Sequence, residues 1–142
     1  MSNFDNKSLF LTAVCEDCDY KFKVSSCNEA AESKIVQREF YNKSDDKSIF
    51  LTYYDCPKCN RRHYVQIDDF KSLNKLKDVK RQFIKLAVLK KKNKEITNMQ
   101  LLKFEKARKD LSSYRINLIR LNNNKKIYDN DTDTDFILRI SV

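Results

Sequence analysis

The sequence predicts an α+β protein with an antiparallel β domain, an antiparallel helical hairpin and a closing C-terminal strand. Three observations support this prediction. Two cysteine pairs lie among segments that alternate between apolar and polar residues. After residue 68 the apolar period changes from two to about seven, and the last residues alternate again. We therefore expect a first domain over 1–68, a basic helical hairpin over 69–123, and an acidic connection with a C-terminal strand over 124–142.

The cysteine pairs are the strongest chemical signal in the chain. They read Cys15-Glu16-Asp17-Cys18 and Cys56-Pro57-Lys58-Cys59, two C-x-x-C motifs. Two intervening residues allow a tight turn to present both thiolates to one ion, and two such turns complete the tetrahedral shell that a structural zinc prefers. Thiol redox chemistry and unpaired cysteines are the alternatives. We predict one structural Zn²⁺ held by Cys15, Cys18, Cys56 and Cys59.

This pattern resembles the zinc-ribbon proteins, in which two such knuckles on β-hairpins clamp one zinc ion. The resemblance covers roughly residues 8–68, and it implies a scaffold but no particular function. Ribbon knuckles commonly have glycine just after the second cysteine. Asp19 and Asn60 stand at those positions, and they are the non-glycine residue types that best tolerate a left-handed backbone. The 37 residues between Cys18 and Cys56 exceed the spacing of a compact site, so we expect an insertion between the knuckles.

Four strands are expected around the knuckles, over 8–14, 19–25, 48–55 and 62–68. The insertion is expected to be a helix over 27–41, because Ser26 and Glu29 have the spacing of a helix capping box. The first knuckle would then lie on a hairpin, and the helix would account for the long spacing between the knuckles.

Two long amphipathic helices are expected next. Apolar residues recur at helical spacing from Phe70 to Leu86, and again, with the spacing of a coiled-coil seam, from Phe104 to Leu121. Thr97 and Gln100 form a second capping-box signature at the start of the second helix. The short connection favours antiparallel packing, with Phe83 and Leu111 in the seam. We expect 122–135 to be a polar, acidic and mobile connection and 136–142 to be a strand that returns to the ribbon sheet.

Charge is strongly segregated along the chain. Residues 1–67 contain ten basic and ten acidic residues, whereas residues 68–126 contain eighteen basic and six acidic residues, a net charge of +12. Residues 127–142 contain one arginine and four aspartates. An exposed helix with such an excess of one sign indicates an anionic partner, although charged helix faces often serve only solvation. The residues predicted to contact a nucleic acid or another partner are Lys58, Arg61, Arg62, Lys71, Lys75, Arg81, Lys85, Lys90, Lys91, Lys92, Lys94, Lys106, Lys109 and Arg120.

Three smaller features each have two interpretations. Lys58, Arg61 and Arg62 surround the second knuckle, where they could bind phosphate or offset the negative charge of a zinc–thiolate centre. His63 could be a ligand or a general base, but a half-buried strand histidine is the ordinary case. Cys27 is expected to be a packed free thiol rather than a ligand or a redox residue.

The composition also excludes some function classes. The chain has no glycine, so it cannot contain a glycine-rich phosphate-binding loop, and no catalytic constellation is recognisable. Four thiolates close the metal shell, which argues against a catalytic zinc. No signal-peptide pattern and no apolar run of membrane-spanning length is present, so we expect a cytoplasmic protein without a membrane or small-molecule partner.

Two hypotheses for the function remain after these exclusions. The first is a non-enzymatic, nucleic-acid-associated or regulatory protein that uses the basic hairpin for phosphate contacts. The second is an inhibitor or adaptor that binds a nucleic-acid-handling host protein, such as RNA polymerase or a CRISPR nuclease. The second follows from a resemblance to the small zinc-ribbon proteins of bacteriophages and mobile elements.

Overall fold

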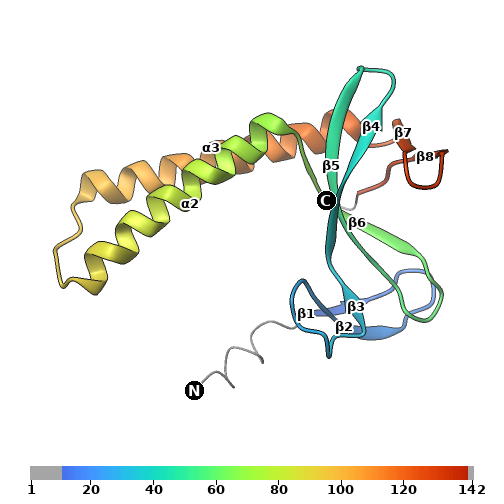
Figure 1. The fold of residues 1–142 in the computed structure, drawn as a ribbon, viewed down its shortest axis with the longest axis horizontal. Coiled ribbons are helices and arrows are strands. Elements are labelled where there is room, and N and C mark those ends of the chain that lie inside the picture. Colours follow the sequence, from blue (N-terminus) through green and yellow to red (C-terminus); the bar gives the residue numbers. More distant parts are fainter. Residues whose placement is uncertain (1–10, 141–142) are drawn as a thin grey trace. The chain divides into compact units, whose positions relative to one another are not determined.

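The computed structural model describes residues 11–140, which form eight strands in two sheets and two helices. The chain divides into two compact units (Figure 1). The β unit consists of the residues up to Gln66 together with those from Asn124 onward, and the hairpin unit is Ile67–Asn123. No helix in the described part of the chain is long and apolar enough to cross a membrane. The expected mixture of α and β structure is thus present.

The first knuckle lies between the first two strands of a three-stranded sheet. Strand β1 (Leu11–Val14) pairs antiparallel with β2 (Lys21–Ser25), and β2 pairs parallel with the two-residue β3 (Ser33–Lys34). In β2, Phe22 and Val24 are buried and the intervening lysines are exposed, as the alternating pattern predicts. The part of the predicted first strand before residue 11 lies outside the described residues.

The prediction of a helix over 27–41 was wrong. Ser25 Oγ accepts hydrogen bonds from the backbone N–H groups of Cys27 and Asn28, which makes a local turn in place of a helix cap. Residues Val36–Asn42 then form β4, which pairs antiparallel with β5 along its whole length. Its residues alternate, with Phe40 and Asn42 buried on one side and Gln37 and Glu39 exposed on the other. The long spacing between the knuckles therefore contains a strand and its turns.

The second sheet has the strand order β6-β5-β4-β7-β8 and contains the main core of the β unit. Strand β5 (Lys47–Asp55) leads into the second knuckle, and β6 (Arg62–Asp68) leads out of it. The predictions of strands over 48–55 and 62–68 are thus confirmed. The fully or nearly fully buried apolar residues of this sheet and the segment after it include Phe40, Ile49, Leu51, Ile127 and Leu138.

The C-terminal segment is more regular than expected. Strands β7 (Lys126–Asp129) and β8 (Thr134–Ile137) form an antiparallel pair, so the predicted acidic connection over 122–135 contains β7 and the start of β8. Arg38 of β4 donates from both terminal guanidinium nitrogens to the carboxylate oxygens of Asp129, at 3.1 Å each, and also pairs with Asp131 at 2.9 Å. Arg38 thus offsets the negative charge of Asp129 and Asp131, for which no partner had been predicted from the sequence. The predicted last strand over 136–142 is displaced toward the N-terminus; Ile140 still bridges to Tyr64, and residues 141–142 are not described.

The hairpin unit contains the two predicted helices, α2 (Phe70–Lys91) and α3 (Asn98–Asn122). They run side by side over much of their length (Figure 1). The capping box of Thr97 with Gln100 is present as predicted, and Asp69 forms another with Ser72 at the start of α2. Both caps satisfy backbone N–H groups that have no partner within the helix. The sequence therefore encodes where each helix begins.

A buried polar network joins α3 to Asp68, the last residue of β6, and to Asp69, the N-cap of α2. Asp68 is fully buried and accepts hydrogen bonds from Arg115 Nε at 2.8 Å, from Arg115 Nη2 at 3.2 Å, and from the Ser72 hydroxyl at 2.8 Å. The Tyr114 hydroxyl donates to Asp69 Oδ2 at 2.6 Å. Because these bonds need specific positions on both helices, they define the register of α3 against α2.

The apolar seam between the helices is closed in one part and open in another. Leu111 and Leu118 are buried, with Leu111 only 6 % exposed. Phe83, by contrast, is 59 % exposed, although its ring contacts that of Phe104 at 6.1 Å between centroids. Phe83 thus contacts α3 across the seam, as predicted, but most of its side chain remains in solvent, because two helices alone cannot surround a side chain of this size.

We expect Leu111→Ala to destabilise the protein by about 2 to 5 kcal/mol, because it removes a buried side chain and leaves a cavity between the helices. The measurement is the free energy of unfolding in urea. Leu102→Ala, at a position that is 65 % exposed, is the matched control and should change that free energy by less than about 0.5 kcal/mol. Equal effects of the two substitutions would contradict the seam described above.

A second prediction concerns alkaline pH. Burial and the hydrogen bond to Asp69 raise the pKa of Tyr114 to about 12, above its ordinary value of about 10 in an unfolded chain. The folded state therefore holds this proton more tightly. The resulting stabilisation is complete below about pH 10 and is lost as the pH rises toward about 12. Urea unfolding across this range should show a steeper loss of stability for the wild type than for Tyr114→Phe; identical pH dependence would disprove the assignment.

Candidate metal centre

The two knuckles have the same backbone geometry. In the first, Asp19 N–H donates to the Cys15 carbonyl at 2.9 Å and Cys15 N–H donates to the Tyr20 carbonyl at 3.0 Å. In the second, the equivalent bonds run from Asn60 to Cys56 and from Cys56 to Arg61, both at 2.8 Å. Asp19 and Asn60 have φ values of 60° and 64°. The left-handed positions predicted from the residue types are thus confirmed.

The knuckles bring all four predicted ligands together. The sulfur atoms of Cys15, Cys18, Cys56 and Cys59 lie within 4.8 Å of one another. The Cys15–Cys59 and Cys18–Cys56 sulfur distances are 3.5 Å and 3.6 Å, and all four thiols are free. Bonds of about 2.3 Å from one tetrahedral zinc ion would place the sulfur atoms about 3.8 Å apart. The arrangement is therefore compatible with a zinc-ribbon-like metal site.

The backbone around the cysteines favours negative charge on two of them. Burial opposes ionisation of Cys15, but the backbone N–H groups of Cys18 and Asp17 outweigh it and lower the pKa of this thiol. Burial likewise opposes ionisation of Cys56, yet the N–H groups of Cys59 and Lys58 lower its pKa to about 7. The two knuckles thus stabilise thiolate at corresponding positions. At Cys18, by contrast, a backbone hydrogen bond at Tyr20 lowers the pKa, but burial and the neighbouring thiols outweigh it and raise the pKa to about 12, and the pKa of Cys59 is raised as well. A bound cation would favour thiolate at all four positions.

The core beside the cluster is small. Phe22, Val24, Cys15 and Cys56 are its buried members, and a few partly buried residues pack around them. Only two of the four are ordinary hydrophobic side chains, so apolar burial contributes little in this part of the β unit. A metal ion would supply the missing cross-link between the three-stranded sheet and the second knuckle.

The basic residues beside the second knuckle have partners within the β unit. Arg61 forms an ion pair with Asp17 of the first knuckle. Arg62 binds both carboxylate oxygens of Asp55, at 2.9 Å and 3.3 Å, and lies 4.0 Å above the Tyr53 ring. Lys58 lies over the Tyr20 ring at 5.9 Å. Each arginine is therefore paired with a carboxylate, and no phosphate ligand is needed to balance its charge. The Arg61–Asp17 pair also links the two knuckles directly.

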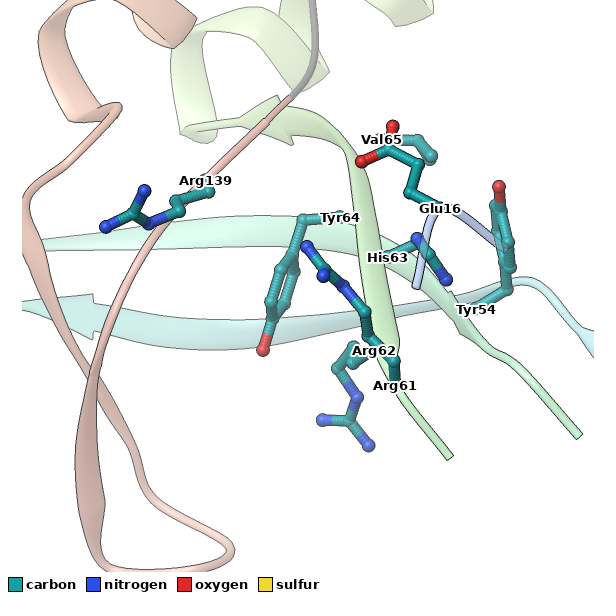
Figure 2. A pocket seen from close by; sticks show the side chains of 8 residues that line it. All are labelled: Glu16, Tyr54, Arg61, Arg62, His63, Tyr64, Val65 and Arg139. Atoms are coloured by element: carbon teal, nitrogen blue, oxygen red, sulfur yellow. The ribbon is translucent and has the colours of Figure 1, made fainter. Parts of the chain in front are cut away.

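His63 does not belong to the sulfur cluster. Its ring stacks on Tyr54 at 5.3 Å, and within the described residues its Nε2 atom is buried without a hydrogen-bond partner. It lines a pocket of about 140 Å³ together with Tyr54, Tyr64, Arg61, Arg62, Glu16, Val65 and Arg139. Figure 2 shows His63 and Tyr54 on one side of β6 and Tyr64 on the other. None of the four cysteines lines this pocket, but a side-chain hydrogen bond with His63 contributes to the lowered pKa of Cys15.

Cys27 is exposed and lies in the turn after β2, with its sulfur atom 4.0 Å from Ser25 Oγ. The prediction that it is packed on a helix was wrong, because the helix itself is replaced by turns and strands. It lies outside the four-cysteine group.

The remaining predicted binding residues lie on the hairpin unit. Lys71 and Lys75 are each 5.6 Å from the centre of the Tyr114 ring, and Arg81 pairs with Asp78 at 3.4 Å. Lys90 and Lys91 lie in the last turn of α2, where cations interact favourably with the helix dipole. Apart from the partly buried Lys75, all of these residues are exposed: Lys71, Arg81, Lys85, Lys90, Lys91, Lys92, Lys94, Lys106, Lys109 and Arg120.

No protein-family model, curated protein or solved structure matches this chain. The candidate metal centre therefore rests on the geometry of the two knuckles alone.

We expect Cys56→Ser to abolish metal binding and to unfold the region around the knuckles, because structural zinc can contribute on the order of 10 kcal/mol to folding. The measurements are metal content per chain and amide exchange over β1–β3 and both knuckles. Cys27→Ser, which removes the exposed thiol outside the cluster, should retain both metal and structure. Native protein without bound metal, or a fully folded Cys56→Ser variant, would refute this assignment.

Proposed function

We propose that the chain is a non-enzymatic zinc-binding protein that uses its metal centre as a scaffold and its basic helical hairpin to bind nucleic acid. The metal part of this proposal is supported by the four converging cysteines. Tetrahedral thiolate sites suit zinc, with iron as the chemical competitor, and metal analysis separates the two. Four protein ligands leave no coordination position for water or a substrate, so the ion has a structural role.

The exposed positive charge of the hairpin unit carries the nucleic-acid part of the proposal. Residues Ile67–Asn123 contain sixteen basic and six acidic residues, a net charge of +10. Two of the acidic residues, Asp68 and Asp69, are engaged in the polar network between the helices. Most of the cations face solvent on the two helices and the turn between them. A helix surface of this charge attracts a polyanion and releases its counterions.

The second candidate is an inhibitor or adaptor that binds a host protein. It is favoured by one specific observation, the exposure of large apolar side chains such as Phe83 and Met99 on the same helices. Apolar anchors of this kind are typical of protein interfaces, whereas phosphate contacts do not need them.

The nucleic-acid proposal predicts steep salt dependence. On duplex DNA, each phosphate that a lysine neutralises adds about 0.9 to the slope of log affinity against log salt. Replacing Lys90, Lys91, Lys92 and Lys94 together with Ala should therefore reduce that slope by up to about 0.9 for each phosphate that these four lysines neutralise. Binding to random duplex and single-stranded oligonucleotides is measured across a salt series.

The matched control replaces four exposed lysines of the β unit with Ala, namely Lys21, Lys23, Lys34 and Lys47. It removes the same total charge and should leave the slope closer to that of the wild type. No detectable oligonucleotide binding at low salt, or equal effects of the two four-lysine variants, would rule out the hairpin turn as the nucleic-acid contact.

A further inference from the structure

The part of the hairpin unit around the connection between its helices leaves many apolar side chains in solvent. Phe83 and Ile84 are each 59 % exposed. Val88, Met99, Leu101 and Leu102 are also exposed, and so are Phe70, Ile116 and Leu121 at the other end of the helices, whereas Leu111 and Leu118 are buried. Exposed apolar groups that gather in one region of a protein surface are typical of an interaction site.

Some of these side chains form a groove between the helices. It has a volume of about 310 Å³ and is lined by Val79, Lys80, Phe83, Ile84, Phe104 and Arg108. Four of the six are apolar, and the Phe83 and Phe104 rings pack against each other at 6.1 Å. A second groove of the same volume on this hairpin is lined by Lys71, Asn74, Lys75, Asp78, Ala107 and Asp110, nearly all polar. Of these two grooves, only the first is lined mainly by apolar residue types.

The charge around the apolar groove restricts the kind of partner. Lys80 and Arg108 stand at the groove itself, and the Arg108 guanidinium lies 5.7 Å from the centre of the Phe104 ring. Residues 79–108 contain ten basic and two acidic residues, a net charge of +8. In a symmetric contact, the same segment of a second copy would bring another +8 and be repelled. An acidic partner would be attracted, and its approach would be accelerated by the same field.

The arrangement of the lining residues also restricts the partner's shape. Val79 and Phe83, Lys80 and Ile84, and Phe104 and Arg108 are each four residues apart, so they form ridges along their helices. A groove between two such ridges accepts the apolar side chains of a third helix at positions i, i+3 or i+4, and i+7. A membrane surface is a poorer fit, because insertion into lipid needs a convex apolar face and not a concave one.

We propose that this groove is the docking site for an acidic amphipathic helix of a partner protein. Apolar residues of that helix fill the space between Phe83, Ile84 and Phe104, and its carboxylates face Lys80, Arg108 and the neighbouring lysines. This inference does not depend on nucleic-acid binding, since the four lysines of the helix connection tested above lie outside the groove lining.

The probe is a synthetic, fluorescently labelled amphipathic peptide with Leu and Phe at helical spacing and Glu at its other positions. A second peptide with Lys in place of Glu and a scrambled peptide of the acidic composition are compared with it. Binding to the full-length, zinc-loaded protein is followed by fluorescence anisotropy. The acidic amphipathic peptide should bind, and the other two peptides should bind at least about tenfold more weakly.

The matched variants are Ile84→Glu in the groove and Leu102→Glu outside it. Both replace an exposed apolar residue of a helix with glutamate, so they change the net charge equally and should leave the helix content unchanged. Ile84→Glu should weaken peptide binding by about tenfold or more, because it places a carboxylate among the apolar contacts, and Leu102→Glu should change it far less.

Other outcomes would overturn the proposal. These are absence of binding by the acidic peptide, equal binding of the acidic and basic peptides, or insensitivity to Ile84→Glu. Self-association in sedimentation experiments that Ile84→Glu abolishes would assign the groove to a second copy, and binding to anionic vesicles that the same variant abolishes would assign it to lipid. Duplex binding by the same variants is measured in parallel, so that failure of the docking-site proposal can be distinguished from failure of the nucleic-acid proposal.

Discussion

The convergence of four cysteine sulfur atoms is the constraint on which the rest of the β unit depends. It joins residues that are 44 and 38 positions apart in the sequence, at sulfur–sulfur distances of 3.5 Å and 3.6 Å. Four thiolates this close together would repel one another unless a cation neutralised them. The neighbouring core offers little apolar burial of its own, with Phe22 and Val24 as its principal members. A metal ion bound by the four cysteines would supply cohesion where hydrophobic contacts are few.

A chain without glycine has to make its tight turns by another route. Among residues 11–140, the residues with positive φ are Asp19, Asp46, Asn60, Asn93, Asn124 and Asp133. Every one of them is an asparagine or an aspartate, the residue types whose short polar side chains tolerate the left-handed region best. Two of them complete the knuckles, and the others lie in turns or at helix ends. The knuckles therefore keep the left-handed turn of the ribbon pattern, although Asp19 and Asn60 stand where glycine is common.

Two regions of the hairpin unit differ in how the helices contact each other and in how far their side chains are buried. Near the start of α2, the buried Asp68–Arg115 pair and the Tyr114–Asp69 bond define how the helices meet. Removal of one partner of such a buried pair is strongly destabilising, since it leaves an uncompensated charge. Nearer the connection between the helices, by contrast, Phe83 and Ile84 remain largely in solvent. The exposed surfaces of those residues are available for a partner.

Some features follow from local sequence alone. The C-x-x-C spacing determined the two knuckles, and Asp19 and Asn60 identified their left-handed positions. Apolar periodicity and the Thr97–Gln100 signature determined the helices, because capping bonds and helical faces involve residues only three or four positions apart. Only the tertiary structure decided between helix and strand at Val36–Asn42, where pairing with β5 outweighed a local capping signature. It also decided that Arg38 reaches Asp129, 91 residues away, and that Phe83 is not covered by α3, because such contacts depend on elements that no local pattern brings together.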